Sequence, residues 1–179
     1  MQWLLSVTLV FVLNIQSTVA EELSFSWATD KELAGQFVQE KHLTILTQPF
    51  VTKGHYLYNK STGLSWNTDY PIASEIHINS RGVSEVQPDG SLKSLTTDSQ
   101  LSELLLAIFS GEPAILQQQF EIEQTENVVI LQPKITQIAQ VMEKIMVQLD
   151  GQLIKQIILH EPDGNYTKII LTSNTDQAN

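Results

Sequence analysis

The sequence predicts an α+β fold, in which one or two helices interrupt a long antiparallel meander of strands. Segments that alternate apolar and polar side chains recur along the chain, and turn residues separate them at roughly ten-residue spacing. One stretch, over residues 101–109, instead carries apolar residues at helical spacing. Such a meander curls into a barrel or half-barrel, and helices on one face of its sheet leave room for a cavity between the two layers.

The first residues have the features of a secretory signal peptide. Residues 1–20 carry no charged side chain, hold an apolar run over residues 3–13 and end in small residues at Ala20. The missing Lys or Arg near the start departs from the usual signal, and an uncleaved short anchor is the alternative. We expect cleavage after Ala20 and a single domain over residues 21–179.

The composition excludes several classes of protein. With 42% apolar residues the chain is neither disordered nor membrane-spanning throughout, and it is long enough to bury a sizeable core. A formal net charge of −10 argues against nucleic acid and against electrostatic docking on anionic lipid. The absence of cysteine excludes a disulfide framework, zinc–thiolate sites and thiol catalysis.

The first half of the chain is expected to be strand-rich after a short helical lead-in over residues 23–33. Tyr56 and Tyr58 alternate with their neighbours, as in a half-buried strand. A turn at residues 61–63 leads into the next strand. The two strands expected after this turn cover residues 64–70 and 74–80.

The second half begins with the amphipathic helix. The helical spacing of its apolar residues begins after Asp98 or Ser99, either of which can be the N-cap. Gly111 and Pro113 end the helix. A second short helix is expected after that stop, over residues 113–118. The remaining strands, with hairpin turns at residues 150–151 and 163–165, are expected over residues 119–124, 127–132, 143–149, 152–160 and 166–172.

The chain lacks the residue patterns that carry catalysis or metal binding. It has no nucleophile elbow and no glycine-rich phosphate loop, and Glu121 and Glu123 fit a solvated strand face better than an acid–base pair. We therefore expect no catalytic residue, no metal and no cofactor. The four histidines are far apart in sequence and are expected to be solvated or structurally hydrogen-bonded: His42, His55, His77 and His160.

Several apolar side chains are candidates for a ligand cavity, because a barrel that accepts acyl chains needs adaptable and aromatic walls. Residue type alone leaves two interpretations open, a ligand cavity and a plain hydrophobic core, because the same side chains suit both. The candidates are Phe37, Tyr56, Tyr58, Leu64, Trp66, Phe109, Phe120, Ile145 and Val147.

The segment from Gly35 to Pro71 resembles the opening strands of the outer-membrane lipoprotein carrier family, the LolA-like proteins. The resemblance rests on the spacing of Phe37, Gln39, Lys41, Leu46, Pro49, Gly54, the Gly-Leu-Ser-Trp run at residues 63–66 and Pro71. Residues 129–134, the Asp150-Gly151 turn and the strand with Ile157 match later strands of the family. The resemblance implies an unclosed antiparallel β-barrel with a few helices as a lid over an apolar cavity, which Phe37, Leu64 and Trp66 face.

The resemblance also implies a function. A family member is a monomeric periplasmic carrier that takes acylated lipoproteins, or other acyl lipids, from an inner-membrane donor to an outer-membrane acceptor. A non-transporting module of the same fold, for lipid sensing or protein interaction, is the alternative. Where the family has an Arg-Pro pair whose Arg latches the lid, this chain has Lys60-Ser61, so Lys60 is either a replacement latch or a solvated hairpin residue.

Overall fold

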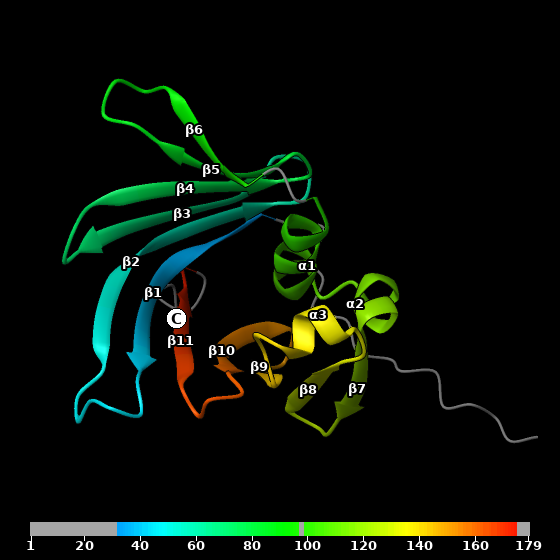
Figure 1. Ribbon diagram of the computed structural model, residues 1–179. Helices are drawn as coiled ribbons and strands as arrows, with labels where there is room; N and C mark the ends of the chain where they lie inside the picture. The colour runs from blue at the N-terminus through cyan, green and yellow to red at the C-terminus, as the bar shows by residue number, and fades with distance from the viewer. Residues whose placement is uncertain (1–31, 97–98, 175–179) are drawn as a thin grey trace, which may run out of the picture.

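One antiparallel sheet of eleven strands, not closed into a barrel, dominates the structure (Figure 1). The computed structural model describes residues 32–96 and 99–174, and it leaves out the side chains of residues 99–101. The strands are β1 (Leu33–His42), β2 (Phe50–Asn59), β3 (Gly63–Tyr70), β4 (Ser74–Asn79), β5 (Gly82–Val86), β6 (Leu92–Thr96), β7 (Phe120–Gln124), β8 (Val128–Pro133), β9 (Lys144–Asp150), β10 (Leu153–His160) and β11 (Tyr166–Ser173). The helices are α1 (Ser99–Ser110), α2 (Pro113–Gln119) and α3 (Thr136–Ala139).

The strands follow one another in the sheet in a simple order. From one edge to the other they run β6-β5-β4-β3-β2-β1-β11-β10-β9-β8-β7, so the first and last strands of the meander, β1 and β11, pair in the middle. The sheet curls, with the helices toward the inside of the curve (Figure 1). The α+β class and the unclosed antiparallel barrel predicted from the sequence are therefore confirmed.

The helices lie where the apolar spacing and the turn residues place them. Helix α1 ends at Ser110. The next residue, Gly111, has a φ of 63°, in the left-handed region, and its N–H donates to Ala107 O at 2.8 Å. Pro113 then opens α2 at the position where its missing N–H costs nothing. The predicted helical lead-in over residues 23–33 falls mainly outside the described residues, and Leu33 itself begins β1.

Three elements do not appear in the sequence-based prediction, namely β5, β6 and α3. All but the last residue of β6 are exposed, so this edge strand lacks the alternation of burial that reveals a strand. Helix α3 is a single turn with no buried residue. The prediction of Glu121 and Glu123 on a solvated strand face is confirmed, because both side chains are exposed on the edge strand β7.

The hydrophobic core is most completely buried between α2 and strands β7 to β9. Six side chains there have no solvent-exposed surface, and burial of each apolar side chain of this size contributes about 1.5–3 kcal/mol to stability. Strands β1 to β4 continue the core with aromatic residues, and α1 covers them. The six fully buried side chains are Leu116, Phe120, Val129, Leu131, Ile145 and Val147.

Candidate functional site

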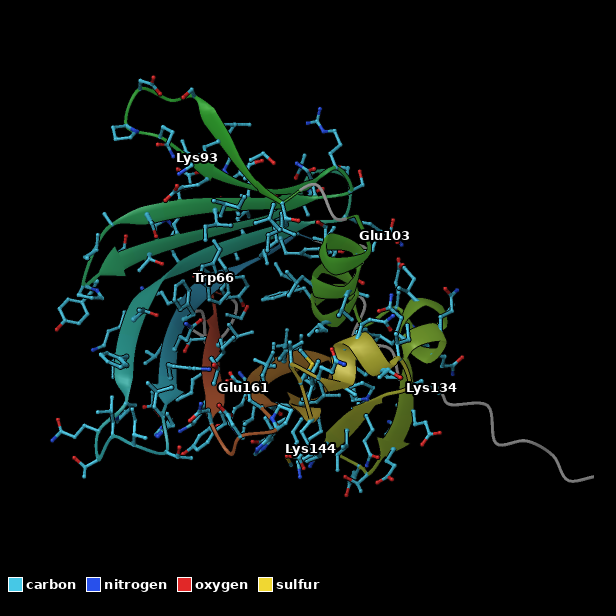
Figure 2. All side chains as sticks on the ribbon, viewed as in Figure 1. Trp66, Lys93, Glu103, Lys134, Lys144 and Glu161 are labelled. Carbon is cyan, nitrogen blue, oxygen red and sulfur yellow. The ribbon has the colours of Figure 1, made fainter. Side chains whose placement is uncertain are left out.

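Strand pairing gathers the aromatic candidates on the inner face of the sheet. Tyr56 lies opposite Trp66 and Tyr58 lies opposite Leu64, while Phe37 lies opposite Gly54, two residues before Tyr56. Directly paired residues point to the same face and successive residues alternate, so these side chains share one face of β1, β2 and β3. Figure 2 shows Trp66 on the inner side of the curved sheet, facing the helices.

Phe109 of α1 completes this aromatic cluster from the opposite side. The rings of Phe37 and Trp66 stack with centroids 3.8 Å apart and an interplanar angle of 21°. The Phe109 ring lies 6.0 Å from that of Trp66, in an edge arrangement, and 6.1 Å from that of Tyr56. Such ring pairs contribute about 0.5–1.5 kcal/mol each beyond the burial of their area. The cluster therefore joins α1 to the sheet with adaptable aromatic contacts.

The members of the cluster differ in their exposure to solvent. Phe37, Tyr56, Tyr58 and Phe109 are 2%, 6%, 4% and 7% exposed, respectively, whereas Trp66 is only partly buried. Trp66 is thus the most exposed ring of the cluster.

Two polar contacts join the end of the β2–β3 hairpin to the junction of α1 and α2. Lys60 Nζ lies 2.8 Å from Glu112 Oε1, and the hydroxyls of Tyr58 and Ser110 share a hydrogen bond. Burial raises the pKa of the Tyr58 hydroxyl, which therefore stays protonated at neutral pH. A hollow of about 190 Å³ lies beside these contacts, lined in part by Glu103 and Leu106 of α1.

The nine predicted cavity residues fall into two groups in the structure. Phe120, Ile145 and Val147 are fully buried in the core formed with α2, on strands distant from β2 and β3 in the sheet order. The other six belong to the same continuous core, but they lie on β1, β2, β3 and α1: Phe37, Tyr56, Tyr58, Leu64, Trp66 and Phe109.

Sequence reasoning missed two kinds of residue at this site. Ile76 and Ile78 of β4 extend the apolar inner face of the sheet, since they pair with Trp66 and Leu64 of β3, respectively. Their alternation in the sequence was the available signal. Glu112, the partner of Lys60, had no such signal, because only the fold brings the α1–α2 junction to the hairpin.

The four histidines lie on four different strands, β1, β2, β4 and β10. Within residues 32–96 and 99–174, no group of three His, Cys, Asp or Glu side chains is placed to hold a metal ion. Two of the histidines pack against the same ring from the strands on either side of it: His42 stacks on Tyr166 at 4.2 Å between ring centroids, and the His160 ring lies 5.9 Å from that of Tyr166. Helices long and apolar enough to cross a membrane are also absent from the described part of the chain.

Comparison with known proteins places the chain in a family. No curated protein matches it in sequence. Among solved structures it is similar to a LolA superfamily protein from Nitrosomonas europaea, with 8% identity, a TM-score of 0.48 and coverage of 80% of this chain and 85% of that one. It is also similar to the MucA/MucB complex of Pseudomonas aeruginosa, with 12% identity, a TM-score of 0.45 and coverage of 84% of this chain and 56% of that one. The family model described as outer membrane lipoprotein carrier protein LolA matches residues 28–179, which is most of the sequence. The chain therefore belongs to the LolA family of outer membrane lipoprotein carrier proteins.

Proposed function

We propose that this protein is a periplasmic, non-catalytic carrier that binds the acyl chains of lipoproteins or related lipids between its curved sheet and α1. The observation that carries this proposal is the aromatic cluster of Phe37, Trp66 and Phe109, in which a helix side chain occupies the inner face of the sheet. Family membership supports the same class of cargo. An acyl chain would take the place of Phe109 when α1 moves away.

The energetics suit reversible binding. At about 0.8 kcal/mol per buried CH₂, a long acyl chain has an upper limit of roughly 10 kcal/mol of burial. Part of this free energy is offset by the loss of the Phe109 contacts with Trp66 and Tyr56, so the net affinity is lower. A carrier of this kind hands its cargo on without nucleotide hydrolysis, from an inner-membrane donor of lower affinity to an outer-membrane acceptor of higher affinity.

Lys60 takes part in this proposal as a latch on the lid. Its ion pair with Glu112 and the neighbouring Tyr58–Ser110 hydrogen bond hold the junction of α1 and α2 against the hairpin. The lysine side chain is 61% exposed, and an ion pair with this exposure contributes at most about 1 kcal/mol. Such a latch favours the closed lid and still allows it to open.

The function is tested by native mass spectrometry, with lipid extraction, on the protein isolated gently from periplasm. We expect a bound acylated protein or lipid. Protein that arrives empty is then titrated with a fluorescent fatty acid, which should bind at a single site. An empty protein that also takes up no fatty acid contradicts the carrier function and favours an interaction module of the same fold.

Removal of the latch contact should change the rate of fatty-acid uptake and leave the fold intact. We expect Lys60→Met and Glu112→Gln each to raise the rate of fatty-acid uptake about threefold to fivefold, because the closed lid loses up to about 1 kcal/mol. Stopped-flow fluorescence measures this rate. Lys93→Met, which removes an exposed lysine from the edge strand β6, is the matched control and should leave the rate unchanged. Equal rates for all the variants would show that Lys60 is a solvated hairpin residue.

A further inference from the structure

A strip of uncharged polar side chains lies next to the aromatic cluster on the inner face of the sheet. Gln39 of β1 pairs with Thr52 of β2, one inward-facing position beyond the Phe37–Gly54 pair. Thr68 of β3 pairs with Gly54 and follows Trp66 on the same face. We call Gln39, Thr52 and Thr68 the polar strip. Neighbouring strands are about 4.8 Å apart, so the polar strip extends over roughly 10 Å from β1 to β3 and can line a head group that carries several polar atoms.

The polar strip is half-buried, and its side chains have no hydrogen-bond partner among the described residues. All three side chains are partly shielded from solvent, yet none makes a hydrogen bond to any residue that the structure describes. A polar group removed from water without a hydrogen bond costs about 1–3 kcal/mol. Water can satisfy these side chains in the free protein, and a ligand with its own hydroxyl or amide groups can replace that water.

The charge of this surface decides which head groups it accepts. Within the described strands β1 to β4, the one charged side chain on the inner face is Lys41, and its Nζ is already paired with Glu161 of the β10–β11 hairpin. An anionic head group placed on the polar strip would lose its hydration without gaining an unpaired cation. The net charge of −10 on the chain disfavours an anion further.

We infer that the polar strip is the head-group site of the carrier and that its cargo is a neutral amphiphile. The acyl chain would lie in the aromatic cluster, and an uncharged head group rich in hydroxyls or amides would lie against Gln39, Thr52 and Thr68. This inference rests on the proposed function and narrows the cargo from acyl lipids in general to those without a charged head.

Two probes with the same chain test the inference, namely monopalmitoylglycerol and palmitate at neutral pH. Each displaces a bound neutral fluorescent lipid from the mature protein, below the concentration at which it forms micelles. We expect monopalmitoylglycerol to bind at least tenfold more tightly than palmitate. The variant Gln39→Leu/Thr52→Val/Thr68→Val should still bind both probes, with the difference reduced to about twofold or less.

The control variant changes the same residue types on the opposite face of the sheet. Gln36→Leu/Thr172→Val alters two exposed side chains that pair across β1 and β11, and the tenfold preference should remain. Equal affinity of the unaltered protein for the two probes, or a preference for palmitate, overturns the head-group site but leaves the carrier function in place. Failure of both probes to bind contradicts the carrier function itself.

Discussion

Replacing Gly54 with alanine should lower the free energy of unfolding by roughly 3 kcal/mol. This is the largest stability loss that we expect from a change that only adds atoms. A Cβ at this position would lie 1.8 Å from the backbone oxygen of Asn67 and 2.9 Å from Cε1 of Phe37. Neither neighbour has room to move, because the first is backbone of the paired strand β3 and the second stacks on Trp66. For a chain of this length the midpoint of thermal unfolding should fall by about 10 °C.

The matched control for this change is Gly90→Ala, in the turn between β5 and β6. A Cβ at Gly90 would meet no atom within 4 Å, but the φ of +81° would be strained for alanine, at a cost of about 1 kcal/mol. Gly54 has no positive φ, so steric overlap alone accounts for its effect. Thermal unfolding followed by circular dichroism separates the two variants. Equal small shifts for both would mean that β2 and β3 separate easily at this point.

The sequence predicted the strands that bury one face and missed those that do not. Tyr56 and Tyr58 are buried and alternate with exposed neighbours on β2, so the period of two is visible in the sequence. In β6, Leu92 and Leu95 are 58% and 50% exposed, so the edge strand forms through its backbone pairing with β5 rather than through an apolar pattern. Local pattern alone therefore could not reveal the last strand at this edge.

The site was only partly predictable, for a different reason. Aromatic residue type selected Phe37, Trp66 and Phe109, which lie in contact in the structure although Phe109 is on a helix and the other two are on strands; that they line a lipid cavity stays a prediction. The same reasoning also selected Phe120, which is fully buried in the core beneath α2. The identity of an apolar residue does not show whether its side chain belongs to a permanently packed core or lines a cavity that can open. That distinction depends on which element covers them, and long-range pairing decides this.

Trp66→Glu should reduce acyl-chain binding by more than about 100-fold, the largest functional loss that we expect from one substitution. The change removes the ring that stacks on Phe37 at 3.8 Å and places a carboxylate where the acyl chain would lie. Burial of that charge against the chain costs several kcal/mol, which exceeds the loss of the ring contacts alone. Because Trp66 is partly exposed in the free protein, the carboxylate can reach solvent there, and stability should fall by only about 2 kcal/mol.

Leu57→Glu provides the control that separates a binding surface from general damage. Leu57 lies on β2 next to Tyr56, but it points to the outer face of the sheet and is 40% exposed. Both variants are checked for the native fold by circular dichroism and then titrated with fluorescent fatty acid. We expect Leu57→Glu to bind as the unaltered protein does, since its charge is on the face away from α1. A folded Trp66→Glu protein that still binds the fatty acid would place the acyl chain elsewhere, and the cluster around Phe109 would then be core.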